Sequence, residues 1–169
     1  AYGPLISQQA KQRVQKLIAE GKAEGAECLL DGSHCEVPGY PDGNWLGPTL
    51  FRNVKPNMSI YREEIFGPVA PIVTVDGDEE AIALAVQLEG GCHHTAAMHS
   101  RNIDNMNQMA NAIDTSIFVK NGPCIAGLGL GGEGWTTMTI TTPTGEGVTS
   151  ARTFVRLRRC VLVDAFRIV

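Results

Sequence analysis

Between Pro71 and Val119 the chain alternates short apolar runs with segments of helical periodicity, and this alternation constrains the fold more than any other feature. The predicted strands are Ile72–Val75, Thr95–Met98 and Ser116–Val119. The segments between them carry apolar residues at helical spacing, with Asp78 placed to cap the first helix and Asn102 at the start of the second. Strands separated by helices of about three turns favour parallel pairing with right-handed crossovers. We therefore predict an α/β fold with alternating strands and helices and a mostly parallel sheet.

The N-terminal part predicts one longer helix and a loop. Ser7 is placed to cap a helix that ends near Gly21 or Gly25. The apolar residues on one face of this helix are Ala10, Val14, Leu17 and Ile18. A short strand is expected at Cys28–Leu30. Pro38–Pro48 is rich in Gly and Pro, and we interpret it as an ordered loop because it also contains bulky aromatic residues.

The segment after Asn121 is the most glycine-rich part of the chain. It satisfies the spacing G-x-G-x-x-G at Gly127, Gly129 and Gly132. The β-branched residues that follow predict no helix whose N-terminus would hold a pyrophosphate, so we interpret these glycines as turns at the mouth of a pocket. The last segment, Phe154–Val169, is rich in Val, Ile and Phe and predicts a C-terminal strand.

Length and composition indicate one packed domain, residues 1–169. The chain has 169 residues, of which 43% are hydrophobic and 19% charged, as in a packed globule. The net charge of -4 argues against binding to nucleic acid or to an anionic membrane surface. A local basic patch at Ala151–Arg159 is interpreted as the solvated face of a strand. Because no apolar run approaches the ~20 residues that cross a bilayer, and no signal-peptide core is evident, we expect a cytoplasmic protein.

Cysteine and histidine give no metal-site signal. The five cysteines are odd in number and form no C-x-x-C pair, which argues against a disulfide framework and a structural zinc site. Cys92, His93 and His94 are consecutive, but neighbouring side chains of an extended segment point in opposite directions. We predict reduced thiols and no metal site.

Tyr61–Val69, with the sequence YREEIFGPV, places a carboxylate, an aromatic ring and a Gly-Pro turn within a few residues. Glu64 is able to accept hydrogen bonds from two adjacent hydroxyls, and Phe66 offers a flat face to a heteroaromatic ring, as nucleotide binding requires. Gly67-Pro68 favours an extended turn over a helix. On spacing alone, a surface loop with one buried Phe and two solvated acids explains the motif equally well.

EEIFGPV resembles the signature of the aldehyde dehydrogenase superfamily. In that family the matching glutamate binds the nicotinamide ribose, and the matching phenylalanine packs beside the nicotinamide ring. The resemblance therefore implies that Glu64 and Phe66 bind the cofactor NAD.

The resemblance continues along the chain but changes subfamily near Pro71. Upstream, Gly3–Val14 and Asn53–Val69 are similar to methylmalonate-semialdehyde dehydrogenases. The blocks that resemble CoA-acylating acetaldehyde and propionaldehyde dehydrogenases are His93–Asn105, Ser116–Pro123, Thr142–Phe154 and Arg158–Val169. The junction near residue 70 leaves three explanations open: a hybrid, a divergent member, or a chain assembled from more than one source.

The family's chemistry implies that the reacting groups lie elsewhere. In the family a cysteine thiolate attacks the aldehyde, a hydride passes to NAD, and in acylating members CoA accepts the acyl group. The nucleophile and the diphosphate-binding fold of relatives lie upstream of Gly3–Val14, so we expect no catalytic residue here and no turnover by this chain alone. Cys124 occupies a position where relatives carry Ser and has no neighbouring His or Lys, so we interpret it as a small buried thiol.

We predict part of an NAD-dependent, CoA-acylating aldehyde dehydrogenase, an oxidoreductase acting on propionaldehyde or acetaldehyde. The alternatives are a methylmalonate-semialdehyde dehydrogenase-like enzyme and a non-catalytic structural or assembly fragment. NAD, with CoA as co-substrate, is expected to bind only in a complete site. In the family the chain end contributes to subunit contacts, so Phe154–Val169 implies a homo-oligomer formed through its strand.

Overall fold

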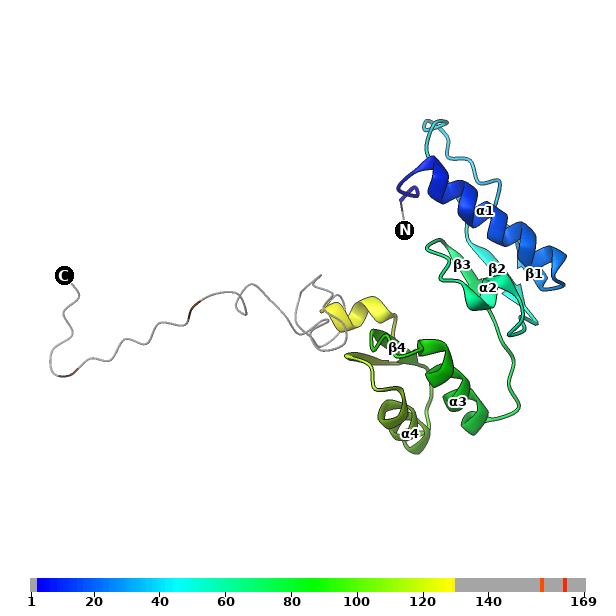
Figure 1. Ribbon diagram of the computed structural model, residues 1–169. Helices are drawn as coiled ribbons and strands as arrows, with labels where there is room; N and C mark the ends of the chain where they lie inside the picture. The colour runs from blue at the N-terminus through cyan, green and yellow to red at the C-terminus, as the bar shows by residue number, and fades with distance from the viewer. Residues whose placement is uncertain (1–2, 130–155, 157–162, 164–169) are drawn as a thin grey trace. The chain divides into compact units, whose positions relative to one another are not determined.

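The computed structural model describes residues 3–129 together with Arg156 and Val163. Contacts divide the chain into two compact units, unit 1 up to Val75 and unit 2 from Asp76, and Figure 1 labels most of their elements. The expectation of a single domain over residues 1–169 stays a prediction. Gly132 and the predicted strand Phe154–Val169 lie outside the described residues, apart from two isolated positions.

Helix α1, Gln8–Ala23, begins where the sequence predicts. The side-chain oxygen of Ser7 accepts a hydrogen bond of 3.1 Å from the backbone N–H of Ala10, which satisfies one of the free donors of the first turn. The helix ends just before Gly25, whose φ of +96° is readily adopted only by glycine. The buried residues of α1 are Val14, Leu17, Ile18 and Gly21.

Unit 1 contains a three-stranded sheet of β1 (Glu27–Leu30), β2 (Thr49–Arg52) and β3 (Val69–Pro71), in the order β1-β2-β3. β1 pairs with β2 antiparallel, and β2 pairs with β3 in parallel register. The predicted strand Cys28–Leu30 is therefore confirmed as β1. The 31–48 loop that joins β1 to β2 is internally hydrogen-bonded, for example from Trp45 Nε1 to the carbonyl of Tyr40 at 2.8 Å, in agreement with the predicted ordered loop.

The predicted strand Ile72–Val75 is wrong, because the strand lies three residues earlier, at β3. Ile72 still donates to the carbonyl of Phe51 and accepts from the N–H of Val54. β2 nevertheless ends at Arg52, where the next residue, Asn53, has a φ of +58°. Because β2 turns away at Asn53, regular strand pairing does not continue along Ile72–Val75.

The core of unit 1 gathers side chains from α1, β2, the short helix α2 (Ser59–Arg62) and the loops beside them. Its members are Val14, Leu17, Ile18, Ala26, Leu46, Phe51, Val54, Met58, Ile60 and Ile65. Phe51 at the centre of the sheet is fully buried. Burial of each large side chain of this kind contributes about 1.5–3 kcal/mol, so this cluster is the main source of stability in unit 1.

Unit 2 contains helices α3 (Asp78–Glu89) and α4 (Ile103–Ile113) and strands β4 (Thr95–Met98) and β5 (Ile117–Lys120). β4 and β5 pair in parallel, as predicted. α4 begins beside Asn102, close to the predicted start, and the side-chain oxygen of Asn102 caps it by accepting from the first-turn N–H groups of Asp104 and Asn105. The α/β class is confirmed, but the two parallel pairings described lie in separate sheets, so one mostly parallel sheet stays a prediction.

The predicted cap of α3 is wrong by one residue. Gly77, in extended backbone with φ of −172°, takes the capping position, and Asp78 is the first helical residue. Asp78 therefore joins two further acids in the first turn, where negative charge interacts favourably with the helix dipole. Its carboxylate also accepts a hydrogen bond from the side chain of Asn105 on α4.

A short 3-10 helix, η1 (Cys124–Leu128), follows β5 and ends at Gly129 with φ of +85°. A Cβ atom at Gly127 would lie 2.2 Å from Cγ2 of Ile117, so glycine permits a close approach of η1 to β5. Gly129 thus lies at a turn and Gly127 at a close approach, whereas the position of these glycines at the mouth of a pocket stays a prediction. Of the helices in the described ranges, none combines the length and the hydropathy needed to cross a membrane.

Candidate functional site

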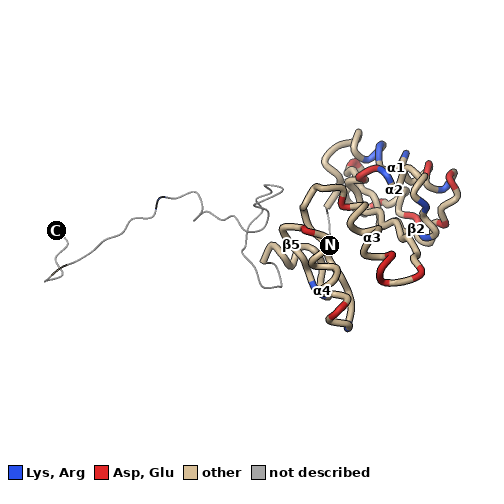
Figure 2. Tube along the Cα trace, turned by 60° about the horizontal axis from the view of Figure 1, so that its bottom comes forward, with Lys and Arg blue, Asp and Glu red and all other residues tan. Residues whose placement is uncertain are grey.

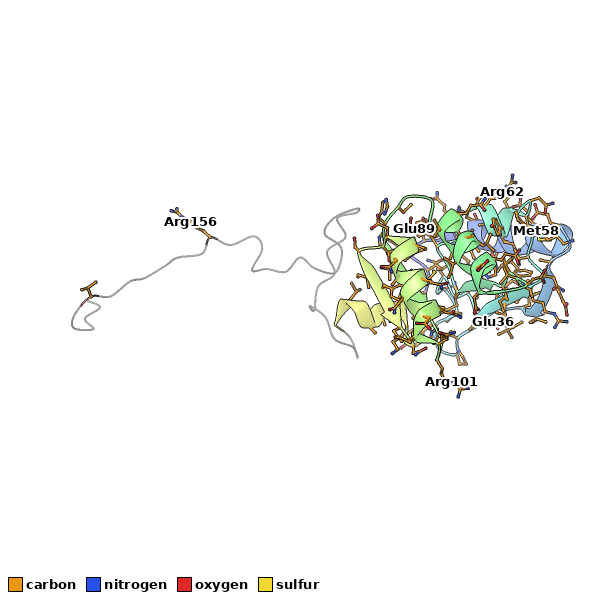
Figure 3. All side chains as sticks on the ribbon, turned by 90° about the horizontal axis from the view of Figure 1, so that it is seen from below. Glu36, Met58, Arg62, Glu89, Arg101 and Arg156 are labelled. Atoms are coloured by element: carbon orange, nitrogen blue, oxygen red, sulfur yellow. The ribbon has the colours of Figure 1, made fainter. Side chains whose placement is uncertain are left out.

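The motif EEIFGP forms a loop, residues 63–68, between α2 and β3. Glu63 leaves the helical region with φ of −104° and ψ of 136°, and Arg62, the last residue of α2, extends away from the ribbon in Figure 3. The carbonyl of Pro68 accepts from the N–H of Thr49 at 2.8 Å, which attaches the end of the loop to β2. The loop is non-helical, as Gly67-Pro68 predicts, but its backbone is not extended at Phe66.

In the 63–68 loop one side chain is buried in the core, and the residues directly before and after it are exposed. Ile65 is 8% exposed and belongs to the core of unit 1, whereas Glu64 is exposed and Phe66 is 73% exposed. A surface loop with one buried phenylalanine is therefore excluded, because the buried residue is Ile65. The structure brings both predicted site residues to the surface of one loop, on either side of an apolar anchor.

Phe66 has a φ of +53°, in the left-handed region. A residue with a side chain held there costs about 1–3 kcal/mol, and such a conformation persists only where the surroundings fix it. One of these surroundings is α1, because a Cβ atom at Gly67 would lie 2.9 Å from both Cγ atoms of Val14. The residue after Phe66 thus packs directly on a buried side chain of α1.

Arg13 of α1 is a second contact to the loop. Its Nη1 donates to the carbonyl of Ile65 at 2.9 Å, and its Nη2 donates to the carbonyl of Glu64 at 2.9 Å. Nη2 also lies 3.3 Å from the carboxylate of Glu63. Sequence reasoning missed this residue, because a single arginine on a helix that carries several basic residues, blue in Figure 2, gives no signal of a partner fifty-one positions away.

The electrostatics of the two loop acids differ. The carboxylate of Glu63 pairs with Arg13, whereas the carboxylate of Glu64 has no hydrogen bond or ion pair within the described part of the chain. A carboxylate without an internal partner is able to accept two hydrogen bonds from a ligand. Glu64 is thus chemically suited to hold a pair of adjacent hydroxyls.

The shifted pKa values of unit 1 belong to structural ion pairs outside this loop. A hydrogen bond from Lys22, followed by hydrogen bonds from Ser33, holds the pKa of the Asp31 carboxyl below its usual value. The hydrogen bond from Arg52 lowers the pKa of Glu27, its neighbour across β1 and β2. These pairs join α1 to the 31–48 loop and β1 to β2.

Among the cysteine and histidine candidates, Cys92 and Cys124 are exposed, whereas His93 and His94 are half-buried. Cys124, at the start of η1, is exposed, so its interpretation as a buried thiol is wrong; it follows Pro123 on a surface turn instead of entering a core. Nδ1 of His93 lies 2.7 Å from the carbonyl of Asp114, a link between the end of α4 and the start of β4. Residues 3–129 contain no cluster of three or more His, Cys, Asp or Glu suited to a metal ion.

Two hollows lie apart from the 63–68 loop. One of about 840 Å³ in unit 1 is lined by Lys11, Cys35, Glu36, Val37, Pro38, Gly39, Pro41, Gly43 and Trp45. Another of about 780 Å³ lies between α3 and α4 in unit 2. Neither is lined by a residue of the 63–68 loop, so Glu64 and Phe66 are outside both hollows.

Comparison with known proteins places these features in one family. The model of the aldehyde dehydrogenase family matches residues 1–137. Acetaldehyde dehydrogenase (acetylating) EutE of Salmonella typhimurium LT2 is 83% identical over 120 residues, 71% of this chain and 26% of that protein. Propanal dehydrogenase (CoA-propanoylating) of Citrobacter freundii is 60% identical over 133 residues, 79% of this chain and 29% of that protein.

A solved structure gives the same result for the fold. The structure from Sinorhizobium meliloti 1021, named for methylmalonate-semialdehyde dehydrogenase and complexed with NAD, has a TM-score of 0.66 at 34% identity and covers 72% of this chain and 24% of its own. The chain thus spans about a quarter of the length of the acetylating relative. Because the family model covers most of the sequence, the chain belongs to the aldehyde dehydrogenase family.

Proposed function

We propose that the chain is part of an NAD-dependent, CoA-acylating aldehyde dehydrogenase whose substrate is acetaldehyde or propionaldehyde. The 83% identity over 120 residues to an acetylating acetaldehyde dehydrogenase carries the proposal. The 60% identity to a CoA-propanoylating enzyme supports the same reaction with the longer aldehyde. A methylmalonate-semialdehyde substrate is the second candidate, supported by the 34% identical structure named for that activity.

Glu64 and Phe66 are proposed to hold the nicotinamide riboside of NAD. The ring of Phe66 is 73% exposed, so one face is free to pack against a heteroaromatic ring. The carboxylate of Glu64, unpaired within the described residues, is free to accept from the two ribose hydroxyls. When bound, NAD would accept the hydride that leaves the substrate.

The described residues are proposed to orient the nicotinamide ring for this reaction. Ile65 anchors the loop in the core, so the side chains on either side of it are held at fixed positions on the surface. Holding a reacting ring in one orientation lowers the entropic cost of reaching the transition state. The nucleophilic cysteine and the fold that binds the cofactor diphosphate are proposed to come from sequence outside this chain, as the resemblance implies.

A chimera tests the reaction class. The matching part of the Salmonella acetylating enzyme is replaced by this chain, and NADH absorbance is followed with propionaldehyde or acetaldehyde, NAD and CoA. We expect NADH to form in a CoA-dependent manner. NADH formation that is independent of CoA would contradict the proposal, and a clear preference for methylmalonate semialdehyde would favour the second candidate.

The isolated chain tests where the nucleophile lies. Incubated with the same aldehydes, NAD and CoA, it should form no NADH, since the reactive thiol is proposed to lie outside it. A signal would overturn this part of the proposal and the non-catalytic alternative alike, and Cys124, an exposed thiol, would be the first residue to replace.

Substitution of the two site residues in the chimera tests the cofactor roles. Glu64→Gln and Phe66→Ala are each expected to weaken NAD binding about tenfold, equivalent to roughly 1.4 kcal/mol, measured by titration calorimetry. The matched control is Glu36→Gln, an exposed acid labelled in Figure 3 with no bonded partner in residues 3–129. Equal NAD affinity in Glu64→Gln and Glu36→Gln would refute the role of Glu64.

A further inference from the structure

The guanidinium of Arg13 holds the backbone of the 63–68 loop on both sides of Ile65. It donates to the carbonyls of Glu64 and Ile65, each at 2.9 Å. The planar fork of arginine presents its N–H donors in a fixed geometry, so two such bonds fix the directions of two successive peptide planes. The second of these peptide planes leads directly into Phe66.

We propose that Arg13 is a positioning residue for the nicotinamide site, an inference that rests on the proposed cofactor roles of Glu64 and Phe66. Arg13 acts through the loop backbone and sets the direction in which these two side chains leave it.

The backbone conformation of Phe66 requires such a device. Its φ of +53° is unfavourable for a residue with a side chain, so an unrestrained loop would relax to negative φ and turn the ring elsewhere. Arg13 holds the peptide planes before Phe66, while Val14, the next residue of α1, contacts Gly67 after it. One turn of α1 therefore fixes the loop on both sides of the ring.

Arg13 also distinguishes between the two neighbouring acids. Its Nη2 lies 3.3 Å from the carboxylate of Glu63, and this contact occupies that acid. The carboxylate of Glu64 has no such partner within the described residues, although its own carbonyl binds the same guanidinium. The arrangement immobilises the main chain of Glu64 and leaves its carboxylate available for ribose hydroxyls.

The chimera described above provides the test. Arg13→Ala is expected to raise the Kd for NAD and the KM for NAD about tenfold or more while leaving the KM for CoA unchanged. Arg13→Lys, which keeps the charge but loses the fork, should give an intermediate Kd. The matched control is Lys16→Ala, on the same helix with a side chain 74% exposed and an ion pair only to Glu20 among the described residues.

The outcomes separate this inference from the proposed function. If Glu64→Gln weakens NAD binding but Arg13→Ala binds NAD like the wild type, only the positioning role is overturned. If Glu64→Gln has no effect, the proposed cofactor site itself fails. A loss of NAD affinity in Lys16→Ala equal to that in Arg13→Ala would show a general effect of charge on α1 and would also overturn the positioning role.

A measurement on the chain itself covers the case in which the Arg13 variant chimera does not fold. The backbone chemical shifts of Phe66 and the amide exchange of residues 63–68 are compared by NMR between wild type and Arg13→Ala. We expect the variant to lose the shifts of the left-handed conformation and to exchange faster. Unchanged shifts and exchange would overturn the inference.

Discussion

Helices α1 and α3 were both predicted from apolar residues at helical spacing, but they differ in how far those residues are buried. α1 buries Val14, Leu17 and Ile18 to 3% exposure or less. All residues of α3 are described and none is buried, with Val86 38% and Leu88 50% exposed. Periodicity in a sequence thus predicts a helix, but whether its apolar face becomes core depends on which other segments pack against it.

The difference extends to the two units that contain these helices. In unit 1 the apolar face of α1 belongs to a ten-residue core. In unit 2 the surface between α3 and α4, which are adjacent in Figure 1, is a hollow of about 780 Å³ lined in part by Ile82 and Val86. The proposed cofactor loop belongs to the well-packed unit, and a rigid support of this kind is what a precisely oriented site requires.

Replacement of core side chains should give the largest difference between the two units. Phe51→Ala removes a fully buried ring and is expected to destabilise unit 1 by about 3–5 kcal/mol. Val86→Ala on α3 should cost less than about 1 kcal/mol, because the side chain already contacts solvent. Urea unfolding of the two variants measures both values, and equal costs would show that α3 is as well packed as the core of unit 1.

A methyl group at Gly67 tests how closely the loop depends on α1. Gly67→Ala places a Cβ 2.9 Å from two methyl groups of Val14, so it should cost about 1–3 kcal/mol of stability. NAD binding by the chimera should weaken in parallel, because the loop has to shift. The control is Gly3→Ala, where no atom lies within 4 Å. If Gly67→Ala matches this control in both measurements, the loop is not fixed by the helix.

Substitutions at the caps of α1 and α3 should change the stability by smaller amounts and in opposite directions. Ser7→Ala removes the side-chain cap of α1 and should cost about 1 kcal/mol. α3 has Gly77 at its cap and no side-chain cap bond, so Gly77→Asn should stabilise it by a few tenths of a kcal/mol. Thermal unfolding of both variants checks the signs, and a loss of stability in Gly77→Asn would show that α3 requires the glycine.

Local features of this fold were predictable because they depend on a few adjacent residues. Ser7, Asn102 and the strand Thr95–Met98 lie where capping and composition placed them. The cap of α3 was missed by one residue because Asp78 is suited both to a cap and to the first turn, and the choice falls to the conformation of Gly77. The strand predicted at Ile72–Val75 failed because its partner turns away.

In the candidate site, too, the features that depend on adjacent residues were predictable and the contacts between distant segments were not. The chemistry of Glu64 and Phe66 could be inferred from the motif, and their exposure follows from the burial of Ile65 between them. The hydrogen bond from Arg13 to the carbonyl of Glu64 could not be inferred, because the two residues are 51 positions apart in the sequence. The bond depends on how α1 packs on the loop. Sequence reasoning found the two groups proposed to face the cofactor and missed the arginine proposed to position them.

The ion pair at the end of α1 supplies the smallest expected effect, and α3 has no basic residue in its last turn to make an equivalent pair. Hydrogen bonds from Lys22 and then Ser33 lower the pKa of Asp31, so the folded pKa lies below the unfolded one and the unfolded state binds more protons. The stabilisation is therefore present above the usual aspartate pKa of about 3.9 and is lost as the pH falls toward the folded value.

The two side chains are 40% and 37% exposed, so solvent screening keeps the contribution of this pair below about 1 kcal/mol. Asp31→Asn should be slightly less stable than wild type at about pH 7, and this difference should shrink as urea unfolding is repeated toward about pH 3. Asp42→Asn, an exposed acid with no bonded partner in residues 3–129, controls for the general loss of a charge. A difference between Asp31→Asn and wild type that stays constant with pH would mean that the carboxylate charge does not stabilise this end of α1. Any advantage of α1 over α3 would then come from packing alone.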